Sequence, residues 1–514
     1  NYNLSGCLVE NKAPDDALVF IDKALELEPL HAGALNRRGE ILLALKRFDQ
    51  CLSTFEVLLK SDPDSENALF GIGQLYIEMG VPQKSIDHLD TAIRNNPKSP
   101  WLLFCRAKAF RNAELIESAI KDYESAIALR ADIEPFFTNL GNIYRDVHRF
   151  DEALVCHERA CSLSPWSITP KNNLALTFKD LGRFSEALES YDRALSLEPD
   201  SAEVNWNKSL LLLLQGNYAE GWPLYEWRLK RDELSADYPQ FQQPLWRGET
   251  ELSGKRLLIH VEQGLGDMVQ FCRFVPELVS RGAEVILQVQ KPLMPLISTL
   301  VSDVSLIAKG DPLPEFDLYC PLMSLPYALG LTIETIPSFD SYLSADPLKV
   351  EDWRNKLGPS NLLRVGVVWS GRPEHKNDHN RSISLDALSP TLDLPVEWHS
   401  LQKEYRASDV DVLSRLDQLH QHQEALSDFS DTAALIENMD LVVTVDTSVA
   451  HVACALGKPT WILLPYLSDF RWLLDRSDSP WYPSATLYRQ KEPGDWSPVF
   501  AKLTEDLAEK IDAY

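Results

Sequence analysis

The chain has 514 residues, of which 45% are hydrophobic and 25% charged, values of a globular protein too long for one average domain. Its formal net charge of −26 argues against a nucleic-acid-binding protein, which needs a basic face for phosphates. No stretch is apolar over the roughly 18 residues that a membrane span needs. The start, Asn1-Tyr2-Asn3, lacks the parts of a signal peptide and falls inside a repeat.

The cysteines indicate the redox environment. All eight are scattered through mostly apolar segments, and they form no C-x-x-C pair. They are predicted to be small buried side chains in a reducing compartment, not a disulfide framework or a zinc site. We therefore expect a cytoplasmic protein.

The first half of the chain repeats itself every 34 residues. Prolines close successive units at Pro29, Pro63, Pro97, Pro165 and Pro199, with Ala131 in the same register. A column of small residues runs through Gly39, Gly73, Ala107, Gly141, Ala175 and Ser209. This register resembles the tetratricopeptide repeat and covers residues 1–234. The resemblance implies an α solenoid of paired helices, whose concave groove binds a peptide or a protein.

A polar column follows the same period at Asn139, Asn173 and Asn207. Because an amide both donates and accepts, a ladder of asparagines can hold an extended peptide backbone. The column resembles the asparagine ladder of O-GlcNAc transferase, which makes these three residues candidates for acceptor binding. The alternative is a solvated face of exposed helices.

An aromatic segment joins the two halves. Trp206, Tyr218, Trp222, Tyr225 and Trp227 end the repeats, and a proline-punctuated stretch follows up to Trp246. A flexible tether is poor in aromatic residues, so we expect a rigid linker over residues 235–254. Alternatively, the aromatics only cap the open end of the solenoid.

The second half alternates strands and helices. Buried-strand patterns at Arg256–Val261 and Glu284–Val289 flank a helix expected from Met268 to Ser280, and further strands are expected at Val304–Ala308 and Phe316–Tyr319. A helical connector then leads to strands at 364–369, 399–402, 441–445, 460–464 and near Thr486. This order predicts two Rossmann-like lobes, at residues 255–346 and 362–514, joined by residues 347–361.

The stretch Asp440–Gly457 reads as strand, sharp turn and helix, with Gly457 ending the helix. Thr447 or Ser448 is expected to cap the helix, and the backbone N–H groups of such a helix start attract phosphate. An ordinary βα turn with a good cap gives the same pattern. In the first lobe, Gly264 and Gly266 let the backbone approach a ligand closely, and Asp267 begins a helix either as a cap or as a general base.

The pairing of Gly264-Leu-Gly-Asp267 with Val445-Asp-Thr-Ser-Val-Ala-His451 is similar to the heptosyltransferase-like glycosyltransferases of family 9. That resemblance implies a GT-B arrangement of two lobes. It implies Asp267 as the general base and Asp446, Thr447, Ser448 and His451 as the residues that hold the donor's diphosphate and sugar.

Other residues fall where the family contacts its donor. They are Gly264 and Gly266 of the first lobe, the loop Trp369, Ser370 and Gly371, the cation Arg381, and Gln402 at a strand end. Asp409-Val-Asp411 is a D-x-D pattern in a segment expected to be a surface helix, so we predict chemistry without a metal and without a cofactor other than the nucleotide-sugar substrate.

Repeats joined to two such lobes resemble, in architecture, O-GlcNAc transferase and bacterial repeat-containing glycosyltransferases, including those that modify flagellin. The resemblance implies inverting transfer of a sugar to a protein hydroxyl, with the acceptor protein in the repeat groove. Two alternatives stay open: transfer to a lipid or polysaccharide, with the repeats recruiting a partner, and an adaptor without activity.

Overall fold

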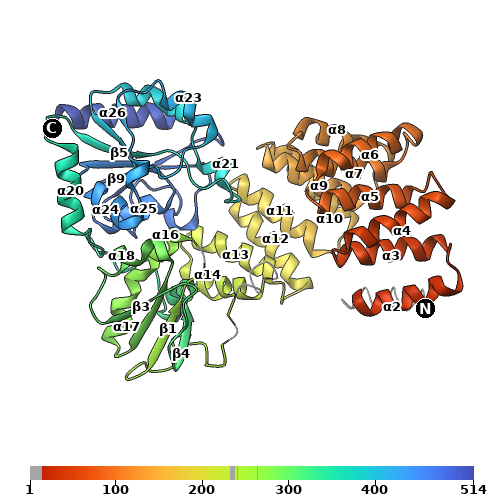
Figure 1. The fold of residues 1–514 in the computed structure, drawn as a ribbon, viewed down its shortest axis with the longest axis horizontal. Coiled ribbons are helices and arrows are strands. Elements are labelled where there is room, and N and C mark those ends of the chain that lie inside the picture. Colours follow the sequence, from red (N-terminus) through yellow and green to blue (C-terminus); the bar gives the residue numbers. More distant parts are fainter. Residues whose placement is uncertain (1–13, 232–237, 240, 263) are drawn as a thin grey trace. The chain divides into compact units, whose positions relative to one another are not determined.

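The computed structural model describes residues 14–231, 238–239, 241–262 and 264–514. It divides into two compact units, residues 1–199 and 200–514. Helical repeats come first and two parallel α/β sheets follow, so the predicted fold class is confirmed (Figure 1). Among the described residues, no helix is both long and apolar enough to cross a membrane.

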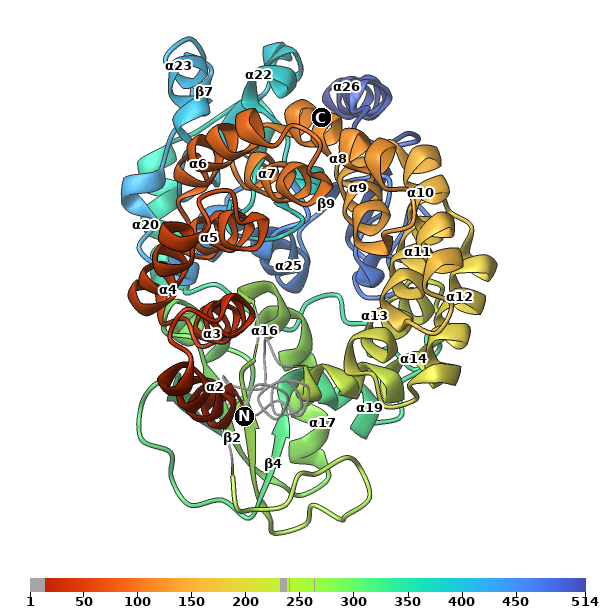
Figure 2. The same ribbon diagram turned by 90° about the vertical axis from the view of Figure 1, so that its right-hand side faces the viewer.

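The first unit is built of helix pairs. Its helices are α2 (Pro14–Leu27), α3 (Ala32–Ala44), α4 (Phe48–Ser61), α5 (Glu66–Glu78), α6 (Pro82–Asn95), α7 (Pro100–Asn112), α8 (Ile116–Leu129), α9 (Glu134–Asp146), α10 (Phe150–Leu163), α11 (Ile168–Asp180) and α12 (Phe184–Leu197). Corresponding helices begin 34 residues apart, as the sequence period predicts. Figure 2 shows α2 to α12 following one another around an arc.

Small residues stand where the paired helices cross. Phe55 of α4 inserts between Gly39 and Gly71, and a Cβ at either glycine would lie 2.3 Å from its ring. Gly141 makes the same room for His157 of α10, at 2.4 Å. The column of small residues is therefore a packing requirement, because a side chain at these positions would separate the helices.

The second unit begins with the last helix pair, α13 (Ala202–Leu214) and α14 (Tyr218–Tyr225), followed by the short helix η1 (Glu226–Lys230). Tyr218, Trp222 and Tyr225 of α14 are buried in one apolar core with both lobes. Leu245 then pairs in parallel with Tyr319, so the end of the linker extends a sheet.

The first lobe contains a four-stranded parallel sheet of order β3-β2-β1-β4. Its strands are β1 (Arg256–His260), β2 (Glu284–Val289), β3 (Val304–Ala308) and β4 (Leu318–Pro321). Between the strands lie α16 (Leu265–Phe271), η2 (Cys272–Phe274), α17 (Val275–Ser280), η3 (Lys291–Leu293) and α18 (Met294–Ile297), and after them η4 (Leu322–Ser324) and α19 (Leu325–Ala328).

The second lobe contains a six-stranded parallel sheet of order β10-β9-β8-β5-β6-β7. The connector α20 (Pro347–Leu357) leads into it. Its strands are β5 (Arg364–Val368), β6 (Glu397–Ser400), β7 (Leu419–His420), β8 (Leu441–Val445), β9 (Thr460–Leu464) and β10 (Ala485–Arg489). Its helices are α21 (Asp378–Arg381), α22 (Leu385–Leu388), η5 (Ser389–Asp393), η6 (Ala407–Asp409), α23 (Val410–Leu413), η7 (Gln423–Ala425), α24 (Phe429–Glu437), α25 (Ser448–Ala455), η8 (Phe470–Trp472) and α26 (Ser497–Asp512).

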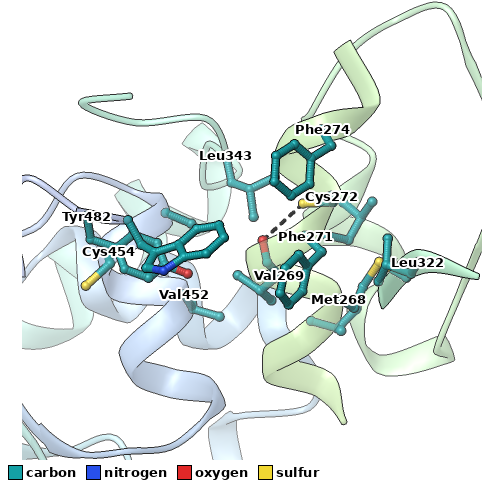
Figure 3. Packing of buried hydrophobic residues seen from close by; sticks show 14 of the residues in the cluster. Met268, Val269, Phe271, Cys272, Phe274, Leu322, Leu343, Val452, Cys454 and Tyr482 are labelled. Atoms are coloured by element: carbon teal, nitrogen blue, oxygen red, sulfur yellow. Dashed lines mark hydrogen bonds between the residues drawn. The ribbon is translucent and has the colours of Figure 1, made fainter. Parts of the chain in front are cut away.

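The two lobes share one apolar core. Figure 3 shows Val269 of α16 and Val452 of α25 facing one another, with Phe271 and Tyr482 beside them. All four side chains are buried. An interface of this kind fixes the starts of α16 and α25 relative to each other.

Two details of the predicted helices were wrong. The helix expected from Met268 to Ser280 begins at Leu265 and breaks at Cys272–Phe274, where Pro276 lacks the N–H that a continuous ladder needs. Asp267 therefore stands inside the first turn. Asp409 is not on the surface: it is buried and accepts the indole N–H of Trp369.

Candidate functional site

The start of α16 is organised by Asp267. Its Oδ2 accepts the backbone N–H of Gly264 at 2.8 Å, which closes the turn between β1 and the helix. The carboxylate is thereby fixed at the carboxyl end of β1, the edge where open α/β sheets bind ligands. The cap and the candidate base are the same side chain, so the two interpretations of Asp267 are compatible.

Gly266 brings the two lobes into contact. A Cβ at this position would lie 2.8 Å from the His451 ring and 3.5 Å from the Ser448 Cα, both in the first turn of α25. Only glycine gives α16 this close approach. The two motifs that the sequence analysis singled out in separate lobes therefore touch.

An arginine that the sequence analysis missed completes this contact. Arg471, in η8 of the second lobe, donates to Asp267 Oδ1 at 2.5 Å. It also donates to Gln270 of α16 and to Asp469, both at 2.7 Å. The guanidinium thus joins the lobes through three acceptors, and its side chain is 9% exposed. The cluster of charged and aromatic residues in the loop that follows β9, Asp469-Phe-Arg-Trp472, is the sequence signal that could have found it.

The environment of Asp267 favours a neutral carboxyl more than solvent does. Burial raises its pKa, while Arg471 and the N–H of Gly264 lower it. The negative charges of Asp469 and Glu262 raise it further. A carboxylate balanced in this way suits a general base, because a raised pKa strengthens its attraction for a proton.

The start of α25 is built differently. Thr447 occupies the N-cap position with an extended backbone, and its side chain caps no N–H of the helix. The Thr447 hydroxyl instead lies 3.4 Å from the Thr444 hydroxyl. Thr447, one of the two expected capping residues, is the N-cap residue of α25, but it makes no side-chain cap hydrogen bond because its hydroxyl lies against the buried strand end. The first N–H groups of α25 therefore receive no side-chain acceptor from Thr447.

Arg381 lies beside the end of β8. Its Nη1 donates to the carbonyl of Asp446 at 3.0 Å, and its Nε lies 3.6 Å from Asp378. The pKa of Asp446 is raised to about 6, first by burial and then by repulsion from Asp469, although Arg381 and Arg471 counteract this. The turn before α25 therefore has both acidic and basic side chains close to it.

The loop after β5 contributes backbone and hydroxyl groups. The Nε2 of Gln402 donates to Ser370 Oγ at 2.7 Å and to its carbonyl at 3.0 Å, whereas its buried Oε1 has no partner among the described residues. Gly371 packs against Arg381, since a Cβ there would lie 2.5 Å from its Nη2. Ser370, Gly371, Arg381 and Gln402 therefore lie together at the carboxyl ends of β5 and β6.

Trp369 points away from these residues. Its indole is completely buried in the second lobe's own core, stacks on Tyr405 at 5.8 Å and donates to Asp409 at 3.1 Å. The burial of this side chain fixes the start of the loop that follows.

His451 is held as a neutral ring. Burial lowers its pKa well below the ordinary value, and the charges of Arg471, Arg273 and Arg381 lower it further. Its Nδ1 lies 2.8 Å from the Tyr482 hydroxyl, and its ring stacks on Trp472 at 5.4 Å. The ring is thus a fixed wall between α25 and Gly266, not a cation.

The asparagine column is divided between the two compact units. Asn139 on α9 and Asn173 on α11 are half-buried, and the Asn139 amide donates to Pro135 at 2.8 Å. Asn207 on α13 belongs to the second unit and is buried. The structure therefore brings Asn139 and Asn173 onto neighbouring helices, since α9 contacts α11.

The arrangement has the parts of a group-transfer site. The Asp267 carboxylate of one lobe contacts Arg471 of the other and lies beside the start of α25, where Arg381 contacts the Asp446 carbonyl. Within the described residues, no three His, Cys, Asp or Glu side chains gather closely enough to hold a metal ion.

Comparison with known proteins finds family matches in both halves of the chain. Tetratricopeptide repeat families match residues 8–69, 67–99, 137–164 and 172–226. Glycosyltransferase family 9 (heptosyltransferase) matches residues 416–472, which include the turn before α25 and the segment of Arg471. The second lobe thus contains a segment that matches glycosyltransferase family 9, and matches to tetratricopeptide repeats precede it.

Relatives match only in part. Protein FlbA of Caulobacter vibrioides is 28% identical over 302 residues, which are 53% of this chain and 50% of FlbA. Anaphase-promoting complex subunit 3 of Schizosaccharomyces pombe is 22% identical over 126 residues, 24% of this chain and 19% of that protein. The chain therefore spans half or less of the length of these relatives.

Solved structures match the repeats at low similarity. TTC0263, a thermophilic TPR protein in Thermus thermophilus, is 22% identical, with a TM-score of 0.32, over 35% of this chain and 99% of that one. MamA is 24% identical, with a TM-score of 0.28, over 32% of this chain and 90% of that one.

Proposed function

We propose that this glycosyltransferase moves a sugar from a nucleotide-sugar donor to a hydroxyl of a protein, with inversion at the anomeric carbon and without a metal. The observation that carries the proposal is the packing of Gly266 on His451 and Ser448, which sets Asp267 beside the start of α25. The proposed base for the acceptor, Asp267, and the proposed binding site for the donor phosphates, the start of α25, are thus adjacent.

The proposed reaction uses these groups in one displacement. Asp267 takes the proton of the acceptor hydroxyl as its oxygen attacks the anomeric carbon. The bond from that carbon to the donor phosphate breaks, and the nucleoside diphosphate leaves. The N–H groups of α25 and the cation of Arg381 stabilise its negative charge. Attack opposite the leaving phosphate inverts the configuration.

The other predicted donor residues shape the site. We assign Ser370, Gly371 and Gln402 to the nucleoside end of the donor, where the unpartnered Oε1 of Gln402 is an acceptor for a base or ribose donor. Asp446, Thr447, Ser448 and His451 surround the diphosphate and sugar. We place the reaction in the cytoplasm, where nucleotide sugars and reduced cysteines are expected together.

Donor choice is tested by thermal shift, since a ligand that binds only the folded state raises its stability. UDP-, GDP-, ADP-, CMP- and dTDP-sugars are screened against the full chain, against R381Q and against K502Q. Lys502 is an exposed cation that pairs with nearby acids of α26, so it is a matched control. One nucleotide class should raise the melting temperature of the wild type and of K502Q but not of R381Q. Failure of every donor to do so would contradict the proposal.

The acceptor is the second part of the proposal. Flagellin is the acceptor that the architecture suggests, and we assign Asn139 and Asn173 to the binding of its backbone. In the full chain, N139A/N173A should reduce transfer to purified flagellin and leave hydrolysis of the donor by water unchanged. Equal transfer by the variant and the wild type would remove the asparagine column from acceptor binding and favour repeats that recruit a partner for another acceptor.

A further inference from the structure

Arg471 is a cation of the second lobe that contacts the candidate base of the first. Its three nitrogens are divided between the lobes: Nη2 donates to Asp267 and Nε to Gln270, both on α16, while Nη1 donates to Asp469 of its own segment. A lysine has one nitrogen and cannot bridge these three acceptors in the plane that they define.

We propose that Arg471 is a positioning residue whose guanidinium orients the Asp267 carboxylate and supplies its counter-charge, so that the base has its working form only while the lobes are in contact. The inference rests on the proposed function, because it gives Arg471 a role through Asp267.

The two carboxylate oxygens of Asp267 have separate partners. Oδ2 accepts from Gly264 N–H within the first lobe at 2.8 Å, and Oδ1 accepts from Arg471 across the interface at 2.5 Å. Two fixed donors set the rotation of the carboxylate. Each oxygen has two lone pairs, so both retain one to accept the proton of an acceptor hydroxyl.

The arginine is itself held rigidly. Its guanidinium lies over the Phe470 ring at 4.4 Å and the Phe271 ring at 5.5 Å, one from each lobe. These faces leave the plane of the guanidinium free for its hydrogen bonds. An arginine ordered in this way loses little further entropy when the reaction requires a fixed carboxylate.

The backbone that presents Arg471 is strained. Leu473 directly follows η8 with φ 55° and ψ −164°, a conformation normally confined to glycine. Arg489 of β10 supports the segment by donating to the Trp472 carbonyl and to Ser468 Oγ. Strain that the surroundings maintain is typical of a segment fixed for function.

The charges around Asp267 come from several elements. Arg471 lowers its pKa, while Asp469 of the second lobe and Glu262 after β1 raise it. Tyr225 of α14 and His375 of the loop after β5 also interact with its charge. Asp446 interacts with Asp469 and Arg471, and Arg381 faces Asp446. Of these groups, Arg471 alone is a cation in contact with Asp267.

The proton balance gives the sign of the test. The base acts only when Asp267 is ionised, so activity falls as the pH drops through its pKa. Without the Arg471 cation, burial and the neighbouring acids raise that pKa, and the acidic limb of the pH profile moves to higher pH. Removal of the Asp469 charge moves the limb to lower pH, because Asp469 raises the pKa of Asp267.

The test measures the pH profile of kcat/KM for R471Q, R471K and D469N in the full chain. The probe is the nucleotide sugar that gives the largest thermal shift, and its nucleoside diphosphate release to water is the readout. We expect R471Q to lose roughly 10- to 100-fold at neutral pH with its acidic limb moved up by about one pH unit. R471K should lie between R471Q and the wild type, and D469N should move the limb down.

Chemical rescue and a matched variant separate this role from a merely structural one. Guanidinium ion added to R471A should restore part of the activity and return the limb toward the wild-type position. Arg476 lies in the same segment but pairs with exposed Asp478, so R476Q should keep the wild-type profile. An R471Q variant that is folded and slower than the wild type by the same factor at every pH would overturn the inference, because loss of the cation would then leave the acidic limb in place.

A wrong proposed function and a wrong role for Arg471 would give different results for D267N. If D267N releases nucleoside diphosphate as fast as the wild type, Asp267 is not the base and the proposed function is wrong. If D267N is inactive and the R471 variants keep the wild-type limb, only the positioning role is wrong.

Discussion

The starts of α16 and α25 lie against each other, yet they are built in opposite ways. In α16, Asp267 occupies its own helix start and accepts the N–H of Gly264. In α25, the Thr447 side chain turns inward to Thr444 and caps no N–H of the helix. The start of α16 is thus occupied by the carboxylate of Asp267, whereas the start of α25 has no side-chain cap from Thr447 and can accept an anionic ligand.

This difference divides the two roles of a transferase between the lobes. A helix start that holds a carboxylate supplies a base, whereas an uncapped helix start supplies donors for an anion. Gly266 allows the two starts to approach, and Arg471 connects them. The predictions below break each part of this comparison in turn.

Removal of the carboxylate at the start of α16 should have the largest effect. D267N keeps the size of the side chain but cannot take a proton, so we expect transfer to fall by ~10²–10⁴-fold. Donor affinity, measured by calorimetry, should be unchanged, because the donor phosphates bind to the other helix start. D311N, at an exposed acid of the same lobe, serves as the control and should transfer like the wild type.

The raised pKa of Asp446, which precedes α25, should make the stability of the protein depend on pH. The folded pKa of Asp446 is about 6, above its ordinary value of 3.8, so the folded state binds the proton more tightly than the unfolded state. The wild type therefore loses stability, about 3 kcal/mol at most, as the pH rises from 4 through 6. The melting temperature of D446N relative to the wild type should increase over this range. A difference that does not change with pH would contradict the assigned pKa.

A methyl group at Gly266 should push the starts of α16 and α25 apart. G266A places a Cβ 2.8 Å from the His451 ring, and the resulting overpacking should cost about 2 kcal/mol and slow transfer. G264A is the matched control, since its Cβ has no neighbour closer than the 3.4 Å to Asp267 and its φ is −72°. Thermal unfolding of the two variants should differ accordingly; equal destabilisation would show that Gly266 does not set the approach.

Substitution of Thr447, at the N-cap position of α25, should change stability least. T447A removes a hydroxyl that caps no N–H, so its stability should change by less than about 0.5 kcal/mol. At the start of α24, the Asp428 side chain accepts the N–H groups of Ser430 and Asp431, and D428A should cost about 1 kcal/mol. A larger loss in T447A than in D428A, measured by denaturant unfolding, would contradict the distinction between capped and uncapped starts.

The repeats and the strands could be predicted because each follows from a local pattern. The period of 34 residues places every helix pair, and buried runs such as Leu441–Val445 and Thr460–Leu464 coincide with β8 and β9. Even the inward indole of Trp369 continues the alternation of Val365 and Val367 into the same core. Reading that alternation would have separated Trp369 from the candidate donor residues.

The site itself depends on contacts between distant segments, which no local pattern encodes. Asp267 and Arg471 are more than 200 residues apart in the sequence. The residues around either one give no indication that the two side chains contact each other. The break of the first-lobe helix at Cys272 was signalled by Pro276, but the second partner of Asp267 was not. Residues that act across an interface between lobes become visible only when the lobes are in place.

The central claim is that one site holds the donor at the start of α25 and the base at the start of α16. A crystal structure of the protein with the nucleoside diphosphate of its best donor tests it most directly. The account predicts diphosphate oxygens at about 3 Å from the first N–H groups of α25 and from the Arg381 guanidinium, with Asp267 facing the free phosphate end. A nucleotide bound to the first lobe alone, or away from both helix starts, would contradict it.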